Sequence, residues 1–516
     1  MSSWLLIQEK IAKDHEFIAE IDVETITFTR IGGYKATPYS LKLNLLNALT
    51  AKSLKGVWRW WARTAIVGAY NGKVNYKKAN EELNKILVSP DKGVSLFRLE
   101  IFDFPTNLEA NLTQINNEID NFYEKAKDFL MNQEAQLGLP NNTKVSVTLN
   151  PSTSAVIIEH DRIPLNQHKD RIDKLIKQGP LKDYFLSSKL GKKDYRIVIT
   201  LRFPKSNDYL QIPRVRLLLM KRGKEEEDSL NRTNIDSEKI TRYMERVKEE
   251  MAALVSKGLK FKILLYGNKD SEKVNFALSS LLLSLILGGV GSMTKRAFGS
   301  LRLLSFRFKD ELKINQEIRK IFQDLQGKEF TKDELKETLE DLCNITINFA
   351  KRLLNISGIQ EFNDIPIVPS LSNIKIEVIE CSSLDPVKIG NAFVKQTWKQ
   401  SFKMKGRNLH TWILGLPRFQ EETGYARKIN YEYETLRRIS SIGARCFKTQ
   451  SKNFIIVFGL LSDDWPKDLL HIRRKNQPDR EKLVRDIPIG NSPQKGNFLQ
   501  NVYDYAFEKV KKLCQI

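Results

Sequence analysis

Glycines and cations gather in the segment 282–306, where they could bind an anionic chain such as a phosphate backbone. The residues concerned are Gly288, Gly289, Gly291, Ser292, Lys295, Arg296 and Gly299. Glycine adopts backbone conformations that are closed to other residues and lets a second backbone approach closely. Exposed N–H groups with cations beside them suit phosphate oxygens. We therefore predict a phosphate-binding loop whose contacts are made by Gly289, Gly291, Ser292, Lys295 and Arg296.

A second interpretation of this segment is structural. An apolar helix would end at Leu287, a glycine C-cap and a turn would follow, and a strand over 301–306 would close the unit. The segment is not a Walker phosphate loop, because the predicted order is helix, loop, strand and no GK[ST] sequence opens a following helix. The residues by themselves leave both interpretations open.

A row of cations runs along the helix predicted after Ser53, which can cap its first turn. Lys55, Arg59 and Arg63 follow one another at intervals of four residues on one face. This row is a candidate for phosphate contact, although such rows are usually solvated helix faces. A neighbouring apolar stripe contains two tryptophans of the same helix.

The tryptophans of this helix divide between the core and a candidate binding role. Trp58 and Trp61 lie on the apolar stripe and are predicted to be core residues, whereas Trp60 lies on neither face. Aromatic faces also stack on unpaired bases, so Trp58 and Trp60 remain candidates for base contact from the start of the helix.

Two further segments mix cations with aromatic rings, as single-stranded nucleic-acid sites do. One is a glycine pair at 32–33 between Arg30 and Tyr34. The other lies late in the chain and contributes Arg418, Arg437 and Arg438. We add these five residues to the candidate binding set.

Composition agrees with an anionic partner. The chain has 516 residues, of which 41% are hydrophobic, so it is globular and long enough for two or three domains. Its 84 Lys and Arg residues exceed its 62 Asp and Glu residues, a net charge of +22. For such a chain nucleic acid is the first expected partner, and a basic surface without a specific ligand is the alternative.

Cysteine usage and hydropathy exclude several other classes. The four cysteines form no CxxC or Cys/His cluster, so we predict no metal, no cofactor and no disulfide framework, and a reduced, cytoplasmic protein. The longest apolar run, 276–287, contains three serines and is shorter than the ~20 residues that a membrane span needs. It is predicted to be a buried helix.

Hydrophobic periodicity predicts an α+β chain with two ferredoxin-like (RRM-like) domains. The first covers 1–309, with insertions near 107–193 and 205–256. The second covers 310–516 and carries added helices, and its expected strands include His410 to Leu414 and Arg438 to Phe447. Within the first insertion we expect 107–136 to be polar and helical and 152–193 to be irregular. The sequence His160-Asp161-Arg162 could suggest acid–base chemistry, but we interpret it as a polar loop.

Four motifs together resemble the RAMP superfamily of CRISPR proteins. They are ITFTRIGG, SLKGVWRWWAR, GGVGSMTKRAFGSL and the later LGLPRF with RRISS. The glycine loop resembles that superfamily's hallmark, and the tryptophan helix resembles the first, double-RAMP subunit of the type III-B (Cmr) effector complex. Residues 107–193 and 205–240 carry no motif that can be assigned.

The resemblance implies a non-catalytic RNA-binding subunit of an antiviral ribonucleoprotein. It would contact guide RNA near its 3′ portion, help to capture target RNA and assemble with other RAMP subunits. Carried over, the RNA site would include Lys55, Trp58, Arg59, Gly289, Gly291, Lys295 and Arg296. The match in the second domain is looser, so Arg418, Arg437 and Arg438 follow from it less directly.

The alternative within the same superfamily is a metal-independent endoribonuclease that processes guide RNA precursors. Such enzymes generally need a general acid–base, often histidine. None of the five histidines lies in the glycine loop or on the tryptophan helix, and no Asp or Glu occurs from Arg30 to Ser53, where slicing relatives use an Asp. We therefore predict a binding subunit and keep the nuclease as the alternative.

Overall fold

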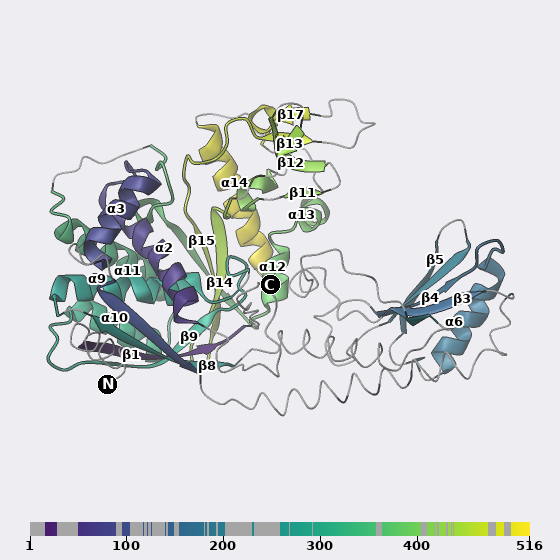
Figure 1. Cartoon of the computed structure of the whole chain (residues 1–516), viewed down its shortest axis with the longest axis horizontal. Coiled ribbons are helices and arrows are strands. Elements are labelled where there is room, and N and C mark those ends of the chain that lie inside the picture. The colour runs from purple at the N-terminus through teal and green to yellow at the C-terminus, as the bar shows by residue number, and fades with distance from the viewer. Residues whose placement is uncertain are drawn as a thin grey trace, which may run out of the picture. The chain divides into compact units, whose positions relative to one another are not determined.

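The structure is a computed structural model of the chain, and it confirms an α+β protein built on antiparallel sheets (Figure 1). The residues that it describes are 16–27, 50–88, 95–103, 117, 121, 125, 140, 143–148, 154–179, 181–182, 185–191, 194–201, 230–231, 258–267, 269–291, 293–357, 364–403, 410–416, 418–420, 423–429, 432–434, 436, 438–472, 481–489 and 497–515. The described part of the chain divides into two compact units. Unit 1 comprises 1–28, 49–104 and 258–516, and unit 2 comprises 29–48 and 105–257.

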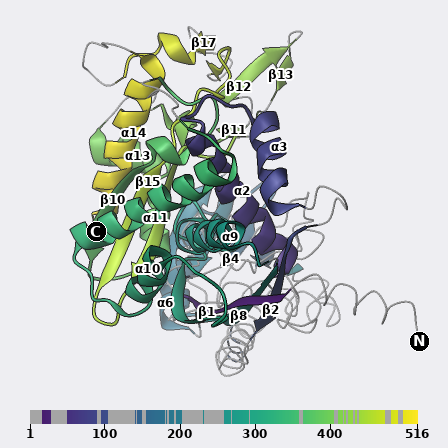
Figure 2. The same cartoon turned by 90° about the vertical axis from the view of Figure 1, so that its left-hand side faces the viewer.

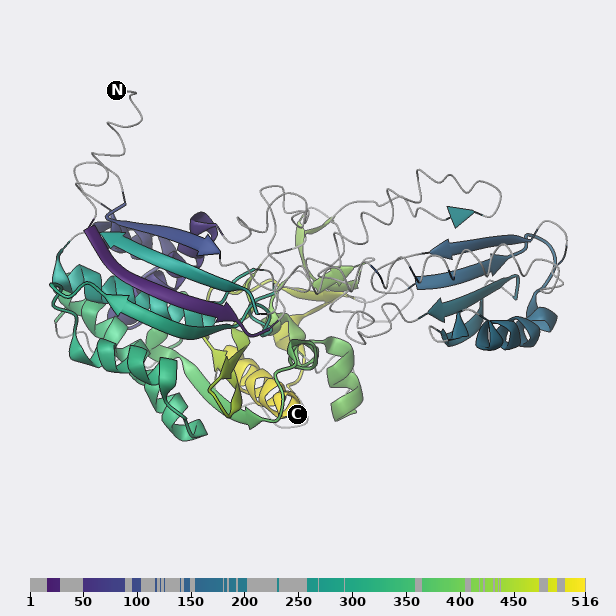
Figure 3. The ribbon, with the colours of Figure 1, turned by 90° about the horizontal axis from the view of Figure 1, so that it is seen from below.

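Unit 1 begins with a four-stranded antiparallel sheet in the order β2-β8-β1-β9. Its strands are β1 (Glu16–Thr25), β2 (Phe97–Asp103), β8 (Lys260–Gly267) and β9 (Leu301–Phe308). Figure 3 shows β1, in purple, running between the teal strands β8 and β9. Buried and partly buried residues alternate along β1 and β8, because successive side chains point to opposite faces of the sheet. One face is therefore apolar and packs on helices.

Three helices form the core above that face. They are α2 (Ala51–Ala69), α9 (Ser271–Leu283) and α11 (Lys332–Leu353), accompanied by α3 (Tyr76–Leu87) and α10 (Gln316–Gly327). Figure 2 looks along α9, which packs against both α2 and α11. Thr50, not the predicted Ser53, caps α2 by accepting a hydrogen bond from the backbone N–H of Ser53. All residues of α9 from Val274 to Leu283 are buried, which explains why it lacks a polar face.

The α9 segment also meets the length and composition expected of a membrane span over Ser271–Gly288, but 83% of that window is buried inside the protein. This confirms the predicted buried helix.

The remaining elements of unit 1 follow α11 in the sequence. A three-stranded antiparallel sheet, β10-β15-β14, contains β10 (Lys375–Cys381), β14 (Ile442–Lys448) and β15 (Asn453–Gly459). A smaller sheet contains β11 (Arg418–Gln420), β12 (Thr423–Ile429), β13 (Glu432–Glu434), β16 (Leu470–Ile472) and β17 (Glu481–Leu483). The helices here are α12 (Pro386–Asn391), α13 (Lys395–Phe402) and α14 (Phe498–Cys514). The predicted boundary near residue 309 lies inside unit 1 and stays a prediction.

One predicted strand in this half is wrong. Residues His410 to Leu414 were expected to be extended, but Thr411–Leu414 forms a buried 3₁₀ turn. His410 before it and Gly415 after it both have positive φ, 44° and 101°, which turns the chain at each end. A short apolar run does not distinguish a strand from a buried turn by periodicity, so the sequence pattern misled here.

Unit 2 contains an antiparallel sheet in the order β5-β6-β4-β3-β7. Its elements are β3 (Lys144–Thr148), β4 (Ser154–Glu159), α6 (Lys169–Gln178), β5 (Phe185–Gly191), β6 (Arg196–Leu201) and β7 (Leu230–Asn231). The expectation that 152–193 is irregular is therefore wrong. In α6, Ile172 and Ile176 are buried and most of the other residues are polar. Two buried residues do not produce a clear helical period in the sequence, so the helix was not predicted. The sequence 160–162 does lie in the connection between β4 and α6.

Candidate nucleic-acid interface

The glycine-rich loop lies between the end of α9 and β9, in the predicted order of helix, loop and strand. A π-helical turn, Ser284–Gly288, ends the helix against α2. A Cβ on Gly288 would lie 2.7 Å from both Nε1 of Trp61 and Cγ1 of Val57, so glycine is required for this close approach. The helix end and the tryptophan helix are thus packed too closely for a side chain between them.

The far side of the loop pairs with β14, which lies almost 150 residues later in the chain. The N–H of Ala297 donates to the carbonyl of Ala444 at 2.8 Å, and the N–H of Ala444 donates to the carbonyl of Lys295 at 3.0 Å. The guanidinium of Arg445, also on β14, donates hydrogen bonds to three loop carbonyls. The loop is therefore held from both halves of unit 1.

Much of the loop's main chain is already hydrogen-bonded within the protein. The N–H groups of Gly289, Val290, Arg296 and Ala297 donate to the carbonyls of Ser284, Gly299, Met293 and Ala444, respectively. These four N–H groups are therefore already engaged, and fewer of the loop's N–H groups than expected are available to a phosphate. Anion binding at this loop has to depend mainly on its cationic side chains.

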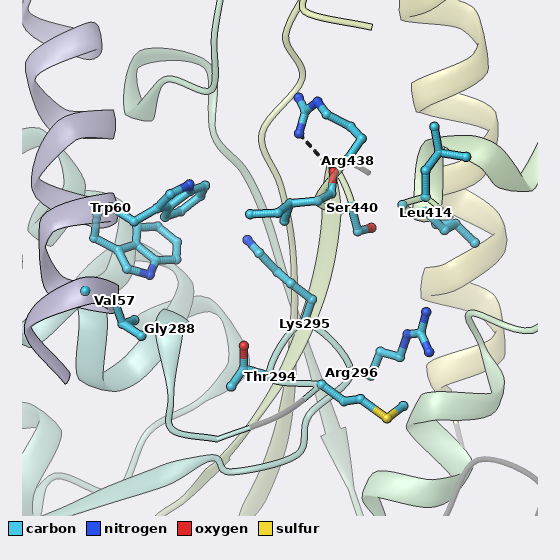
Figure 4. Close-up of a pocket in the computed structure, with 15 residues that line it drawn as sticks. Val57, Trp60, Gly288, Thr294, Lys295, Arg296, Leu414, Arg438 and Ser440 are labelled. Carbon is cyan, nitrogen blue, oxygen red and sulfur yellow. Dashed lines mark hydrogen bonds between the residues drawn. The ribbon is translucent and has the colours of Figure 1, made fainter. Parts of the chain in front are cut away.

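A cavity of about 540 Å³ opens between this loop, α2 and two later segments (Figure 4). It is lined by Gly56, Val57, Trp60, Trp61, Gly288, Met293, Thr294, Lys295, Arg296, Leu414, Gly415, Leu416, Arg438, Ile439 and Ser440. Three of these residues are basic, namely Lys295, Arg296 and Arg438, and none of the lining residues that the structure describes is Asp or Glu. Four sequence motifs were expected to belong to one family pattern, and residues of three of them meet in this cavity.

Lys295 extends from the loop toward Trp60, whereas Arg296 points to the side of Leu414 (Figure 4). The ammonium of Lys295 lies 4.7 Å from the ring centre of Trp60, 5.3 Å from that of Trp61 and 4.4 Å from that of Phe458. Aromatic faces attract a cation, but they do not neutralise its charge as a carboxylate does. The ammonium is thus held in place with its charge available to an anion.

Burial and neighbouring guanidinium groups lower the pKa of Lys295 to about 7. Loss of water is the largest cause, and repulsion by Arg445 and Arg438 adds to it. The ammonium is consequently only partly protonated near neutral pH. A phosphate beside it would favour the charged form and raise the pKa again.

We expect the affinity for single-stranded RNA to be highest below pH 7 and to fall as the pH rises above 7. Above pH 7 the unbound Lys295 loses its proton, so RNA binding has to be accompanied by uptake of one proton. The affinity then decreases by up to about tenfold per pH unit. The measurement is the dissociation constant of a labelled oligouridine between pH 6 and 9 at constant ionic strength.

Lys295→Arg is the matched control, because a guanidinium stays charged over this range and can lie against the same rings. It should remove most of the pH dependence. A pH profile that is the same in the wild type and in this variant would show that Lys295 does not titrate on binding.

Arg438 lines the cavity but is already paired. Its guanidinium forms an ion pair with Asp464, donates to Ser462 Oγ at 2.8 Å and lies 4.7 Å from the ring centre of Trp465. The side chain is only 12% exposed. Arg438 is therefore held by these contacts, and it also stabilises the rim of the cavity, because its Nη1 donates to the carbonyl of Ile439 at 2.9 Å.

The cationic row on α2 does not line the cavity. Lys55 donates to Ser95 Oγ at 2.7 Å, Arg59 donates to Asn84 Oδ1 at 2.7 Å, and Arg63 donates to Asn80 Oδ1 at 3.3 Å. These three hydrogen-bond partners are uncharged, so the row keeps its positive charge while it packs against α3 and the residues just before β2. A role in RNA contact for this row remains a prediction.

Trp58 and Trp61 are core residues, as the helical periodicity predicted. Trp58 is 0% exposed, and its Nε1 donates to Ser280 Oγ of α9 at 2.8 Å. Because no part of its side chain reaches the surface, we leave Trp58 out of the binding site, where the resemblance had put it. Trp60 is half-buried and lines the cavity, and Trp61 also lines it although its side chain is only 1% exposed.

Several predicted site residues cannot be placed. Arg30, Tyr34, Ser292 and Arg437 lie outside the described residues, and of Arg418 only the strand β11 is described. Gly289 and Gly291 both have positive φ, 71° and 83°, which favours glycine, and Gly291 is exposed.

The sequence patterns missed Arg445, Phe458 and the segment Leu414 to Leu416 as parts of this site. Arg445 and Phe458 lie in segments whose sequence pattern is that of ordinary buried strands, so nothing in the local sequence indicates that they belong to a binding site. The Leu414 segment and Ile439 with Ser440 had a signal, since they belong to the LGLPRF and RRISS motifs.

None of the described histidines lines the cavity. His410 is 1% exposed, and its Nδ1 accepts a hydrogen bond from Trp412 Nε1 at 3.3 Å. His471 lies on β16 beside Tyr425. His160 and His168 belong to unit 2, and His15 lies outside the described residues.

Comparison with known proteins agrees with these motifs. The profile of the RAMP superfamily matches residues 22–302. The CRISPR system CMR subunit Cmr1 of Saccharolobus solfataricus is 26% identical over 266 residues, a match that covers 50% of this chain and 49% of that protein. The aligned region thus spans about half the length of this curated relative.

Among solved structures, a chain of a type III-B Cmr-beta complex superposes with a TM-score of 0.53 over 97% of this chain and 100% of its own length. That complex was determined by cryo-EM with cognate target RNA and AMPPnP in the presence of single-stranded DNA. The two chains are 16% identical, so the likeness shows a shared fold alone.

Proposed function

The chain belongs to the RAMP superfamily, and from this premise we propose that it is a non-catalytic RNA-binding subunit of a type III-B CRISPR effector complex. The observation that supports this most is the cavity beside the glycine-rich loop. Lys295 and Arg296 project from the loop without a carboxylate among the described lining residues. Such a site attracts the phosphate backbone of a nucleic acid rather than a neutral or cationic ligand.

Single-stranded RNA suits this cavity better than a duplex. The half-buried ring of Trp60 lies beside the ammonium of Lys295, and an aromatic ring next to a phosphate-binding side chain can stack on an unpaired base. A duplex keeps its bases stacked inside and has a rigid backbone that cannot enter a 540 Å³ cavity. We therefore assign the site to an unpaired stretch of RNA.

Within the complex, we propose that the chain contacts guide RNA near its 3′ portion and helps to capture target RNA for antiviral defence. Its partners would be the other RAMP subunits of the complex, and its location would be the cytoplasm. Support comes from the similarity to Cmr1 and from the likeness to a chain of a complex that was solved with target RNA.

We further propose that the first sheet and its helices form a ferredoxin-like RAMP domain and that a second such domain follows residue 309. The order β1, α2, β2, β8, α9, β9 and the sheet order β2-β8-β1-β9 support the first of these. The second has β10, β14, β15 and α14 as its partial counterpart.

The test is a titration of labelled single-stranded RNA with the purified full chain at several salt concentrations, with and without Mg²⁺. Each sample is also resolved on a denaturing gel. We expect intact RNA and an affinity that falls with salt, with each phosphate contact adding roughly 0.7 to the log–log slope.

Two outcomes would contradict the proposal. Absence of binding at low salt would remove the RNA-binding role from the isolated chain. Cleaved RNA that ends in a 2′,3′-cyclic phosphate without Mg²⁺ would favour the alternative, a metal-independent endoribonuclease that processes guide RNA precursors.

A further inference from the structure

Arg445 is an unusual residue for its position. It lies in the middle of β14, a strand with six consecutive buried residues, and its side chain is 0% exposed. Nη1 donates to the carbonyl of Thr294 at 2.8 Å and to that of Phe298 at 2.7 Å, and Nη2 donates to the carbonyl of Gly299 at 2.6 Å. All three acceptors belong to the glycine-rich loop.

Gly289 and Arg445 fit as a pair. A Cβ built on Gly289 would overlap Nη2 and Cζ of Arg445, so the guanidinium occupies the space that any other residue at 289 would fill. Gly289 also has a φ of 71°, a conformation that residues with a Cβ rarely adopt. Glycine is therefore needed at position 289 so that the side chain of Arg445 fits against the loop.

Arg445 is a buried cation whose described hydrogen-bond acceptors are all neutral. Burial lowers its pKa to about 10, so it stays charged at neutral pH, and the described acceptors of its hydrogen bonds are three loop carbonyls. Burying a cation without a counter-ion is unfavourable compared with an apolar side chain of similar size. The contact with the loop is what distinguishes arginine from such a side chain here.

The direction of the loop's dipoles follows from this contact. Three loop carbonyls point at the guanidinium. The carbonyl of Thr294 comes just before the two cations in the sequence, and those of Phe298 and Gly299 come after them. Their negative ends are thereby turned away from an incoming anion. Lys295 and Arg296, between them, are left to project into the cavity (Figure 4).

We infer that Arg445 is a positioning residue of the RNA site. It does not touch RNA itself, but it holds the carbonyls of the glycine-rich loop and so orients the cations that do. This inference rests on the proposed RNA-binding function. It assigns to the second half of the chain a direct role in shaping a loop that belongs to the first half.

The test replaces Arg445 with methionine in the full chain and follows two quantities. Hydrogen exchange of peptides that cover 284–300 reports the loop without RNA, and titration of a labelled oligouridine reports binding. We expect faster exchange in these peptides and an affinity lower by about tenfold or more, because a loosened site loses its geometry. Arg445→Lys should restore part of both, since an ammonium can donate to the same carbonyls.

Ile455→Ala is the matched control. Ile455 is 0% exposed on the neighbouring strand β15 and pairs with Cys446, so its truncation destabilises the same sheet without removing a loop contact. This variant should melt at a lower temperature while loop exchange and RNA affinity at 25 °C stay within about twofold of the wild type. An equal loss of affinity in this control would overturn the inference.

Unchanged loop exchange in folded Arg445→Met would also overturn it. If that variant does not fold, Gly289→Ala takes its place, because the added Cβ displaces the guanidinium, and the same two changes are expected. Should the wild type bind no RNA while loop exchange still depends on Arg445, the proposed function fails and the positioning of the loop stands.

Discussion

Replacing both Lys295 and Arg296 with glutamate is expected to lower the affinity for single-stranded RNA by about 100-fold at low salt, or about 2.7 kcal/mol. Two basic residues that line the cavity become two anions, and none of the described lining residues is Asp or Glu. Because phosphates are the same at every position, the loss should be similar for different base sequences.

The measurement is a titration of labelled RNA at several salt concentrations. The log–log slope should fall by roughly 0.7 for each phosphate contact that is lost, about 1.4 for both. Lys313→Glu with Lys320→Glu is the control, because both residues are exposed, neither lines the cavity, and the net charge changes by the same amount. If the control loses as much affinity, the overall charge of +22 and not this loop binds RNA.

Replacing Trp58 with alanine is expected to lower the stability of the protein by about 3–5 kcal/mol. The indole is 0% exposed, lies against Phe97 at a ring-centre distance of 6.1 Å and donates its N–H to Ser280. Truncation removes apolar contacts between α2, α9 and β2 and leaves a cavity in their shared core. The free energy of unfolding from urea denaturation, together with the melting temperature, measures this loss.

Trp60→Ala provides the comparison, since Trp60 is on the same helix but lines the binding cavity. It should cost much less stability and weaken RNA binding by about 1–3 kcal/mol if its ring stacks on a base. The opposite pattern, with Trp58→Ala stable and defective in binding, would return Trp58 to the site that the family resemblance assigned to it.

The sequence by itself determined the local elements that carry the site. The spacing of apolar residues predicted α2 with Trp58 and Trp61 in the core, and the long apolar run predicted a buried α9. The first prediction depended on the 3.6-residue period of burial along one helix, and the second depended on the length of the apolar run. Helix, glycine loop and strand were also predicted in the correct order.

Sequence patterns gave wrong predictions where a helix has few buried residues and where the backbone turns sharply. The stretch 152–193 contains β4, α6 and β5, but the few buried positions of α6 gave no clear period. The run Thr411–Leu414 is apolar because it is buried, not because it is extended. In both cases the residue types reflect contacts with distant segments.

Only the tertiary structure decided which cations share a site. Lys55, Arg59 and Arg63 form a regular row in the sequence, yet they pack against α3 and β2, while Lys295 and Arg296 meet Arg438 in the cavity. It also decided what the glycines do, because Gly288 admits Trp61 and Gly289 admits Arg445. A contact between residues 289 and 445 depends on how two halves of the chain pack, and a pattern of period two or 3.6 carries no information about such a distance.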